Sequence, residues 1–363
     1  MSKTRRIEAV FELIRIVAAM AVAYVVALII LFLISDDPAY VIGQFVLGPF
    51  STMRRFGDVI SLAIPFMFTG LCMCFMYAVN KFNLVGEGVF MTGGLIASWI
   101  VISLADSNVP GLVLIILAVV VAAVIGGAIT AIPALLDARF KANVVVISLM
   151  LNYILWYFIQ HVLKYKIKDS TIAFTGSVEI PIRANLPKLV SGTTVHFGLI
   201  IALLCTVVVC VLFYKTPFGY SLRTVGNNPS FAKYVGIGIM STTVMAQVVG
   251  GVFAGMGGAI EILGMYRRFQ WANVMTGHGF DGLIIAVLAK RNPTFVPIAA
   301  LLLAYIRIGA DIVNRTTDIP AEFVTIIQGV IILLVAAELF LAGFKNKMIF
   351  KNAKEDLAKQ ETA

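Results

Sequence analysis

The sequence predicts an all-α polytopic membrane protein, and three observations support this fold class. Hydrophobic residues make up 60% of the 363 residues and charged residues only 13%, whereas a soluble domain is about half apolar and a quarter charged. The apolar residues gather in long runs, and a membrane-spanning helix needs about 20 of them. Basic residues gather between these runs. We therefore expect about ten transmembrane helices, some of them broken, in a single transmembrane domain over residues 1–363.

The apolar runs place the expected spans in order along the chain. They lie near residues 12–34, 59–79, 88–104, 111–133, 143–163, 196–214, 241–263, 281–290, 294–313 and 322–342. The first run is too long for the apolar part of a signal peptide and lacks a small-residue cleavage site, so we interpret it as an uncleaved helix. The eighth is too short to cross alone, and we expect a tilted or broken helix there. An even number of spans places both termini on one side.

The distribution of Lys and Arg predicts which side that is. With both termini in the cytoplasm, the inner segments account for the whole net charge of +9 and the outer segments are balanced. The charge therefore calls for no nucleic acid partner. The expected cytoplasmic segments include a loop at 215–238 and a tail at 345–363. The outer loop at 164–195 is long enough to contact an external partner, although an ordinary solvated loop explains it equally well.

The 215–238 loop carries helix breakers and caps in an ordered sequence. We expect a turn, a short helix over 221–225, and a second short helix that ends at Tyr234. The residues that predict the turn, the second N-cap and the second stop are Pro217, Gly219, Asn228, Ser230 and Gly236. Two short helices form a rigid knob that can transmit the motion of a separate motor. The alternative is an ordinary surface loop.

Several function classes lack their expected residues. There is no GxxxxGK[ST] phosphate-binding loop, so we expect no ATP hydrolysis by this chain. The three His are widely spread, which argues against an intramembrane enzyme, and we expect no metal site. An ion-coupled secondary transporter should have paired charges near the bilayer midplane, whereas the charges here lie mostly at span ends. Glu261 and Arg307, near the outer ends of their spans, can pair across the bundle, and extension of Arg307 to the membrane interface is an equally good alternative.

Four stretches of sequence carry a family resemblance. They are residues 82–88, 148–154, 219–237 and 277–289. In this order they resemble motifs of the ABC importer permeases for simple sugars, nucleosides and branched-chain amino acids, and the first, second and fourth resemble the nucleoside branch most. Two departures exist. Val144 follows Asn143 where the family often has Glu, and Leu84-Val85 stands in place of Ile-Gly.

This resemblance implies a transport subunit that is not itself an enzyme. It implies import of nucleosides, and we expect purine nucleosides; ribose or another simple sugar is the alternative cargo. ATP and Mg²⁺ would be bound by partner cytoplasmic ATPases, with no cofactor in this chain. The other implied partners are a second, non-identical permease, an external substrate-binding lipoprotein and membrane lipid, in a bacterial inner or plasma membrane. The residues implied in coupling to the ATPase are Gly219, Leu222, Arg223, Gly226, Asn228, Ala232 and Gly236.

The expected substrate path draws on the 82–88 and 277–289 motifs. Its residues are Asn83, Glu87, His278, Phe280 and Asp281. Ionisable groups at membrane depth are costly and usually functional. Asn83 and Asp281 can bond ribose hydroxyls or a base edge, and Phe280, His278 or Trp271 can stack on a planar base. The alternative is that Asn83, Glu87 and Asp281 cap helices. Asn152, within its span, can hydrogen-bond another helix.

Overall fold

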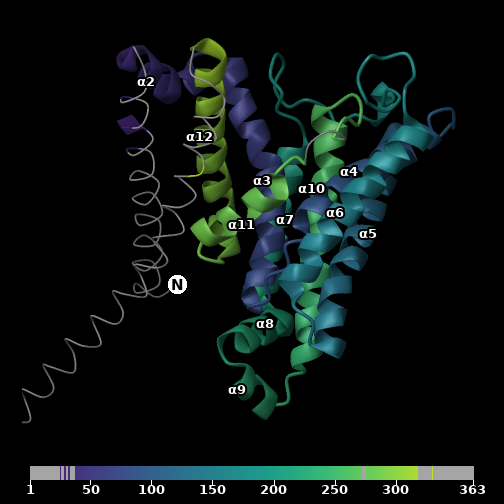
Figure 1. Ribbon diagram of the computed structural model, residues 1–363, viewed down its shortest axis with the longest axis vertical. Helices are drawn as coiled ribbons and strands as arrows, with labels where there is room; N and C mark the ends of the chain where they lie inside the picture. The colour runs from purple at the N-terminus through teal and green to yellow at the C-terminus, as the bar shows by residue number, and fades with distance from the viewer. Residues whose placement is uncertain are drawn as a thin grey trace, which may run out of the picture. The chain divides into compact units, whose positions relative to one another are not determined.

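The computed structural model describes residues 37–271 and 275–317, together with a few isolated positions outside these ranges. This part is helical, and its β-structure is limited to isolated bridges. Its helices are α2 (Pro38–Leu47), α3 (Met53–Ala78), α4 (Gly86–Ser103), α5 (Gly111–Phe140), α6 (Val144–Val162), α7 (Gly198–Lys215), α8 (Pro217–Asn227), α9 (Pro229–Tyr234), α10 (Ile239–Met265), α11 (His278–Leu288) and α12 (Val296–Thr316) (Figure 1). Seven helical segments are long and apolar enough to cross a membrane, so the chain is a multi-pass membrane protein.

The predicted spans between residues 59 and 313 each correspond to a helix, and the eighth, α11, is short as expected. The spans at 12–34 and 322–342 and the tail at 345–363 lie outside the described residues, so ten spans and cytoplasmic termini stay predictions.

Two predicted boundaries are wrong. α5 does not stop near residue 133, because a helix in a membrane tolerates Pro133; it ends where Lys141 adopts φ +52°. The described residues between the first two expected spans contain α2 and the start of α3, and the Asp37 and Thr52 side chains cap these helices by accepting from the Tyr40 and Arg55 amides.

The described residues fall into two units. The first comprises residues 1–48 and 309–363. In its described part, α2 packs closely on the end of α12, since a Cβ at Gly309 would lie 2.7 Å from the Phe45 carbonyl oxygen. The second unit, residues 49–308, contains all the candidate site residues that follow.

The core of the second unit is built around α10, which packs on α3, α4 and α5. Small residues allow the backbones to approach. A Cβ at Gly255 would lie 2.3 Å from the Ala122 carbonyl oxygen, and one at Gly258 would lie 1.8 Å from that of Phe90. Helices in membranes associate through such small-residue contacts, because lipid supplies no hydrophobic force between them. The glycines of α10 therefore set the helix spacing on which the site depends.

Substitution of Gly255 tests this packing. Gly255→Val places a branched side chain against the α5 backbone. Overpacking of this kind lowers the free energy of unfolding by about 1–3 kcal/mol or more. We expect a clearly lower melting temperature of the purified protein in detergent. The control is Gly43→Ala, because an added Cβ there meets no atom within 4 Å. Equal melting temperatures for the two variants would contradict the packing account.

The connections of the second unit alternate between its two ends, as the sequence predicted. At one end, Asn80 bonds the Gly226 carbonyl at 2.6 Å, and Lys81 pairs with Asp137 at 2.7 Å. At the other end, the Arg183 guanidinium donates to the Ser107 carbonyl at 2.7 Å. Figure 1 shows α8 and α9 at one end of this unit and the 164–197 connection at the opposite end. Polar contacts thus join the connections at each end.

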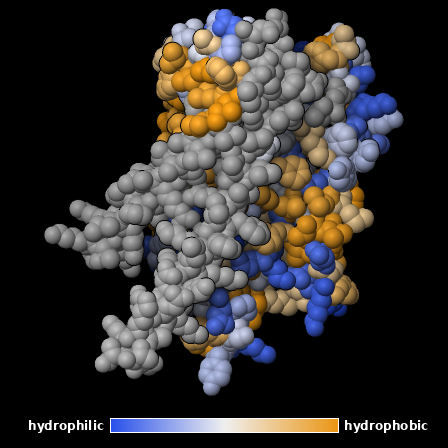
Figure 2. All heavy atoms as spheres, turned by 60° about the vertical axis from the view of Figure 1, so that its left-hand side comes forward, coloured by the Kyte–Doolittle hydropathy of each residue, from blue (hydrophilic) through white to orange (hydrophobic). Residues whose placement is uncertain are grey.

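Apolar side chains cover much of the outer surface of the helices. On α5, Leu112, Ile116, Val120 and Val124 are exposed in the isolated chain. Figure 2 shows broad hydrophobic patches, in orange, on the face that it presents. A surface of this kind is suited to contact lipid tails or another membrane subunit.

Candidate functional site

Two segments outside regular α-helix lead into the helices of the candidate site. Residues 79–85 lead into α4, and the described residues 266–271 and 275–277 precede α11. Asn83 donates to the Thr130 carbonyl at 3.2 Å, and Thr130 lies ten residues before the end of α5 at Phe140. At 1.5 Å per helical residue, Asn83 therefore lies beside α5 at a level about 15 Å from the end of that helix. Irregular backbone at such a depth must have its polar groups satisfied by protein.

The Asn83 side chain supplies part of the hydrogen bonding that this irregular backbone needs. Its amide nitrogen also donates to Gln247 Oε1, and its oxygen accepts from the Val85 amide at 3.1 Å. The Asn83 side chain is completely buried. The structure therefore places it in contact with α5 and α10, apart from the other predicted path residues.

The 148–154 motif supports the same segment from α6. Ser148 Oγ accepts from the Leu84 amide at 3.0 Å. Asn152 accepts from the Gly88 amide at 2.9 Å and donates to the Leu84 carbonyl at 2.7 Å. The expected interhelical bond of Asn152 is confirmed, and two of the motifs prove to be parts of one contact.

Glu87 joins the start of α4 to the start of α11. Its side chain is completely buried in the first turn of α4. One carboxylate oxygen accepts from Thr276 Oγ1 at 2.9 Å and the Gly277 amide at 2.8 Å, and the other accepts from the Gly279 amide at 2.6 Å. These donors lie at the start of α11, where the helix dipole favours a negative charge. The Glu87 carboxylate of α4 therefore binds the N-terminus of α11.

Two glycines make this approach possible. Gly277 adopts φ +78°, a left-handed conformation that side chains rarely adopt. A Cβ at Gly279 would lie 2.3 Å from the Glu87 amide nitrogen, which is backbone and cannot move aside.

Asp281, one turn into α11, forms the second buried charge contact. Its Oδ1 pairs with Arg307 of α12 at 2.6 Å, and Oδ2 has no hydrogen-bond partner among the described residues. The guanidinium also lies 5.6 Å from the Phe66 ring centroid. The expected pairing of Arg307 with Glu261 is wrong, because Arg307 is midway along α12 whereas Glu261 is one turn from the end of α10.

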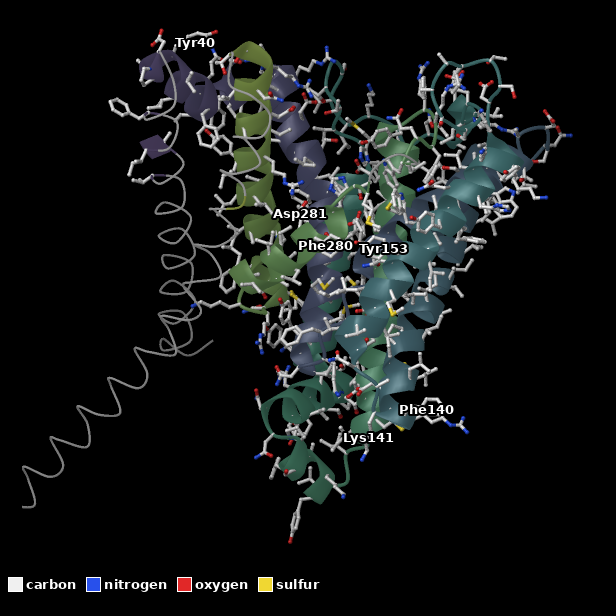
Figure 3. All side chains as sticks on the ribbon, viewed as in Figure 1. Tyr40, Phe140, Lys141, Tyr153, Phe280 and Asp281 are labelled. Carbon is white, nitrogen blue, oxygen red and sulfur yellow. The ribbon has the colours of Figure 1, made fainter. Side chains whose placement is uncertain are left out.

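An aromatic cluster surrounds His278. Its ring meets Phe66 and Phe90 edge-on at 5.6 and 5.4 Å, and Phe90 stacks on Trp271 at 5.3 Å. Phe280 lies about 200° around α11 from His278 and is 38% exposed, so it points away from this cluster. Figure 3 shows Phe280 and Asp281 on α11, between the two ends of the long helices. The structure thus brings together Glu87, His278 and Asp281.

A cavity of about 530 Å³ opens beside this cluster. Its lining residues are Phe174, Thr175, Tyr266, Gln270, Trp271, Met275, Thr276 and His278. The volume lies within the range of about 300–1,000 Å³ that is usual for small-molecule sites. Thr276 connects the lining to Glu87, and His278 Nδ1 is buried without a partner among the described residues. Within 37–271 and 275–317, no cluster of His, Cys, Asp or Glu could hold a metal ion.

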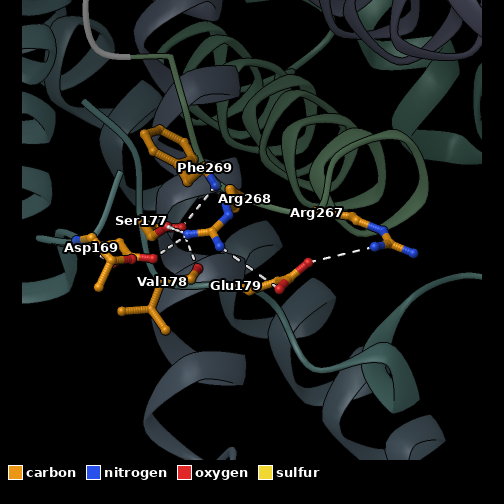
Figure 4. A network of polar contacts seen from close by, with 8 residues as sticks. Asp169, Ser177, Val178, Glu179, Arg267, Arg268 and Phe269 are labelled. Atoms are coloured by element: carbon orange, nitrogen blue, oxygen red, sulfur yellow. Dashed lines mark hydrogen bonds and ion pairs between the residues drawn. The ribbon is translucent and has the colours of Figure 1, made fainter. Parts of the chain in front are cut away.

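The connection at 164–195, which the sequence predicts to be an outer loop, contributes two of these lining residues, and paired backbone contacts hold it in place (Figure 4). The Ser177 amide donates to the Phe269 carbonyl, and the Phe269 amide donates to Ser177 Oγ, both at 2.9 Å. Arg268 pairs with Asp169. Hydrogen bonds from Thr171, together with Arg268, lower the pKa of Asp169 to about 2, so this pair stays charged at neutral pH. The loop is therefore packed over the cavity.

At the opposite end, α8 and α9 form the predicted knob, which we define as residues 217–234. The second helix begins after Asn228, whose side chain accepts from the Phe231 amide at 3.0 Å, and it is followed by Gly236 at φ +80°. The expected turn at Pro217–Gly219 is wrong. Thr216 caps the first helix there, and a proline is well suited to the first helical turn.

The predicted coupling residues hold the knob together. Leu222 and Ala232 are completely buried. Backbone packs closely on two glycines: a Cβ at Gly219 would lie 2.2 Å from the Leu212 carbonyl oxygen, and one at Gly226 would lie 1.9 Å from that of Ala78.

Three exposed aromatic residues of the knob lie outside this set. Tyr220, Phe231 and Tyr234 are about half to almost fully exposed, and Tyr234 reaches 94%. The motif pattern did not single them out, because exposure of an aromatic residue has no local signature in the sequence.

Comparison with known proteins identifies the family. The model of the family described as "Branched-chain amino acid transport system / permease component" matches residues 56–336. The chain is 30% identical to the guanosine ABC transporter permease protein NupP of Bacillus subtilis, over 84% of this chain and 88% of that protein. It is 28% identical to the nucleoside ABC transporter permease protein NupB of Lactococcus lactis, over 89% and 90%. It is also 28% identical to the glucose ABC transporter permease protein TsgB13 of Haloferax volcanii, over 94% and 90%. No solved structure matches the chain significantly.

These similarities confirm the resemblance drawn from the four motifs. The family match covers most of α3, all of α4 to α12 and the knob, and the relatives are named as permease proteins. The chain is thus a transport subunit and not an enzyme. With its membrane helices, its buried polar site and its knob, this chain belongs to the permease-component family of branched-chain amino acid transport systems.

Proposed function

We propose that this chain is the membrane-spanning permease subunit of an ATP-driven importer for nucleosides, and that its cargo is a purine nucleoside. The observation that carries the proposal is the cavity lined by aromatic residues, whose lining residue Thr276 donates to the buried Glu87 carboxylate. The names of NupP and NupB, which refer to guanosine and to nucleosides, support the same cargo.

The cavity offers both kinds of contact that a nucleoside needs. The Trp271 ring provides a face on which a planar base can stack, with Phe174 on the outer loop as a second wall. The Gln270 amide can hydrogen-bond the base edge. Asp281, with one free carboxylate oxygen, can accept from ribose hydroxyls deeper in the path.

A simple sugar is the second candidate cargo. TsgB13 is named as a glucose permease and is similar over almost the whole chain. The Asp281–Arg307 pair would serve a sugar equally well, since carboxylates and guanidinium groups bond hydroxyls. The aromatic lining of the cavity favours a nucleoside over a simple sugar, because a nucleobase can stack on it.

The proposed partners follow from the two ends of the bundle. A cytoplasmic ATPase that binds ATP and Mg²⁺ would dock on the exposed Tyr220, Phe231 and Tyr234 of the knob. A substrate-binding lipoprotein would deliver cargo at the outer loops, and a second, non-identical permease would complete the path. The assembly would lie in the inner or plasma membrane of a bacterium, with both termini of this chain inside. ATP binding would favour one of two states of the path.

Uptake of radiolabelled guanosine and ribose, in cells with and without this gene, tests the cargo. We expect guanosine uptake to disappear with the gene and excess unlabelled ribose not to compete. Loss of ribose uptake instead would support the assignment as a permease and identify ribose, not guanosine, as the cargo. No change in either would contradict the proposed cargo altogether.

Replacement of Trp271 by alanine tests the stacking surface. Stacking of a base on an aromatic ring contributes about 1–3 kcal/mol, so we expect the concentration of guanosine for half-maximal uptake to rise about tenfold. Trp99→Ala is the matched control, because Trp99 lies on the outer surface of α4 and is 39% exposed. Equal uptake by both variants would remove Trp271 from the path.

A further inference from the structure

Two chains of side-chain contacts connect the knob to the segment that follows α11. Both end within residues 290–292, and apart from Arg223 and Gly226 the sequence motifs assign no role to their members. α11 itself has 11 residues and is therefore about 16 Å long. Its far end carries His278 and Asp281. Whatever moves the 290–292 segment moves this end of the substrate path as well.

The first chain of contacts starts at the last turn of α8. The Gly226 carbonyl accepts from Asn80 Nδ2 at 2.6 Å, and Asn80 Oδ1 accepts from Arg291 Nη1 at 2.9 Å. The Arg291 guanidinium also lies 5.3 Å from the Tyr77 ring centroid, and its backbone amide donates to the Ala286 carbonyl of α11 at 2.7 Å. One asparagine thus bridges α8 and the end of α11.

The second chain of contacts starts one turn earlier. The Arg223 guanidinium donates to the Phe213 carbonyl and lies 5.5 Å from the Tyr214 ring centroid. The Tyr214 hydroxyl donates to Asn292 Oδ1 at 2.8 Å. The same Asn292 oxygen accepts from the Thr294 amide at 3.0 Å and so caps the short helix before α12.

The backbone where the first chain passes is held in an uncommon conformation. Asn80, Lys290 and Arg291 have φ values of +53°, +52° and +61°. Residues other than glycine rarely adopt positive φ, and they keep it only where surrounding contacts impose it. Two consecutive basic residues in this conformation make the end of α11 a fixed turn. A fixed turn transmits displacement to the helix, whereas a flexible link would absorb it.

We propose that Asn80, Tyr214, Arg291 and Asn292 are positioning residues that pass movement of the knob to α11. This inference rests on the proposed docking of an ATPase on the knob. Displacement of α8 pulls on Asn80 and Tyr214, which carry the 290–292 segment and with it α11. The contacts of Glu87 with Gly277 and Gly279 at the other end of α11 then change, and the path switches state. A relay of this kind needs all its members, because each contact is a single hydrogen bond or ring contact.

A cysteine on α11 reports this movement without reference to the cargo. Phe280→Cys, at a position that is 38% exposed, is introduced into a chain in which the partly exposed Cys210 is replaced by alanine. The chain is purified together with the ATPase that accompanies it, and the rate of maleimide labelling is measured with and without ATP. Coupling between two sites typically changes the affinity at one of them about 5–150-fold when the other is occupied. We therefore expect ATP to change the labelling rate about fivefold or more.

The relay predicts how variants alter this response. Asn80→Ala and Arg291→Ala should reduce the ATP effect to less than about twofold while the ATPase still co-purifies and hydrolyses ATP. The double variant should be no worse than either single one, because both remove the same link. The matched control is Lys81→Ala, one residue from Asn80, which loses only its pair with Asp137. Its ATP response should be unchanged.

Three results would count against the relay. A full ATP response in Asn80→Ala and Arg291→Ala would overturn it and leave the proposed function intact. Failure of the parent chain to co-purify with an ATPase would overturn the proposed function and the relay together. If the alanine variants fail to fold, Tyr214→Phe removes one hydroxyl from the second chain of contacts, and a full response there would equally overturn the proposal.

Discussion

Replacement of Glu87 by alanine is expected to abolish uptake and to destabilise the protein. The substitution leaves the Thr276 hydroxyl and the Gly277 and Gly279 amides without their acceptor. Hydrogen bonds to charged groups contribute about 1.5–3 kcal/mol each. Alanine also relieves the cost of a buried charge, so we expect a net loss of about 3–5 kcal/mol in the free energy of unfolding, below the simple sum.

Thermal melting in detergent and guanosine uptake measure the two effects. Glu87→Gln should be intermediate, because its carbonyl accepts some of the bonds while its NH₂ group faces donors. The control is Glu179→Ala, since Glu179 pairs with Arg267 and Arg268 at the outer end and its side chain is 51% exposed. Normal melting and uptake in Glu87→Ala would show that α11 does not depend on this carboxylate.

Arg223→Glu and Gly226→Pro are expected to abolish uptake while membrane insertion stays normal. Glutamate reverses the charge that donates to the Phe213 carbonyl and covers the Tyr214 ring. Proline at Gly226 adds carbon where a Cβ would lie 1.9 Å from the Ala78 carbonyl oxygen. Within a helix, proline costs about 3 kcal/mol or more. Both changes displace α8 from the bundle without affecting an apolar span.

Membrane fractionation and uptake together check this result. Thr224→Ala is the control in the same helix, because it loses only a bond from its hydroxyl to the Tyr220 carbonyl. Uptake at the normal rate in Arg223→Glu or Gly226→Pro would contradict the role of the knob in coupling. Absence of the variants from the membrane fraction would show that the knob is needed for folding instead.

The sequence predicts the features that local chemistry determines. Apolar run length located the long helices from α3 to α12, since a lipid environment leaves few alternatives to a helix. Asn228 and Gly236 located the second helix of the knob, because a side-chain acceptor and a left-handed residue act within one turn. Pro217 begins α8 and does not form the expected β-turn. Proline is favoured both in β-turns and at the first position of a helix, so the residue alone does not distinguish the two.

The arrangement of the site depends on contacts that no local pattern records. Glu87 meets donors about 190 positions further along the chain, and neither segment has a periodicity that points to the other. Arg307 pairs with Asp281 only because α11 ends in a turn that returns the chain as α12. The position of Phe174 over the cavity depends on how the outer loop pairs with residues 267–269. The residue types of the path were recognisable, but their grouping was not.

Transport into vesicles tests the central claim most directly. The chain is reconstituted with the proposed second permease, ATPase and binding protein, and guanosine accumulation is measured with ATP, with a non-hydrolysable analogue, and with an ion gradient in the absence of ATP. The account predicts accumulation that needs ATP hydrolysis and is lost in Glu87→Ala. Accumulation driven by an ion gradient without ATP would contradict it and identify the chain as part of an ion-coupled transporter.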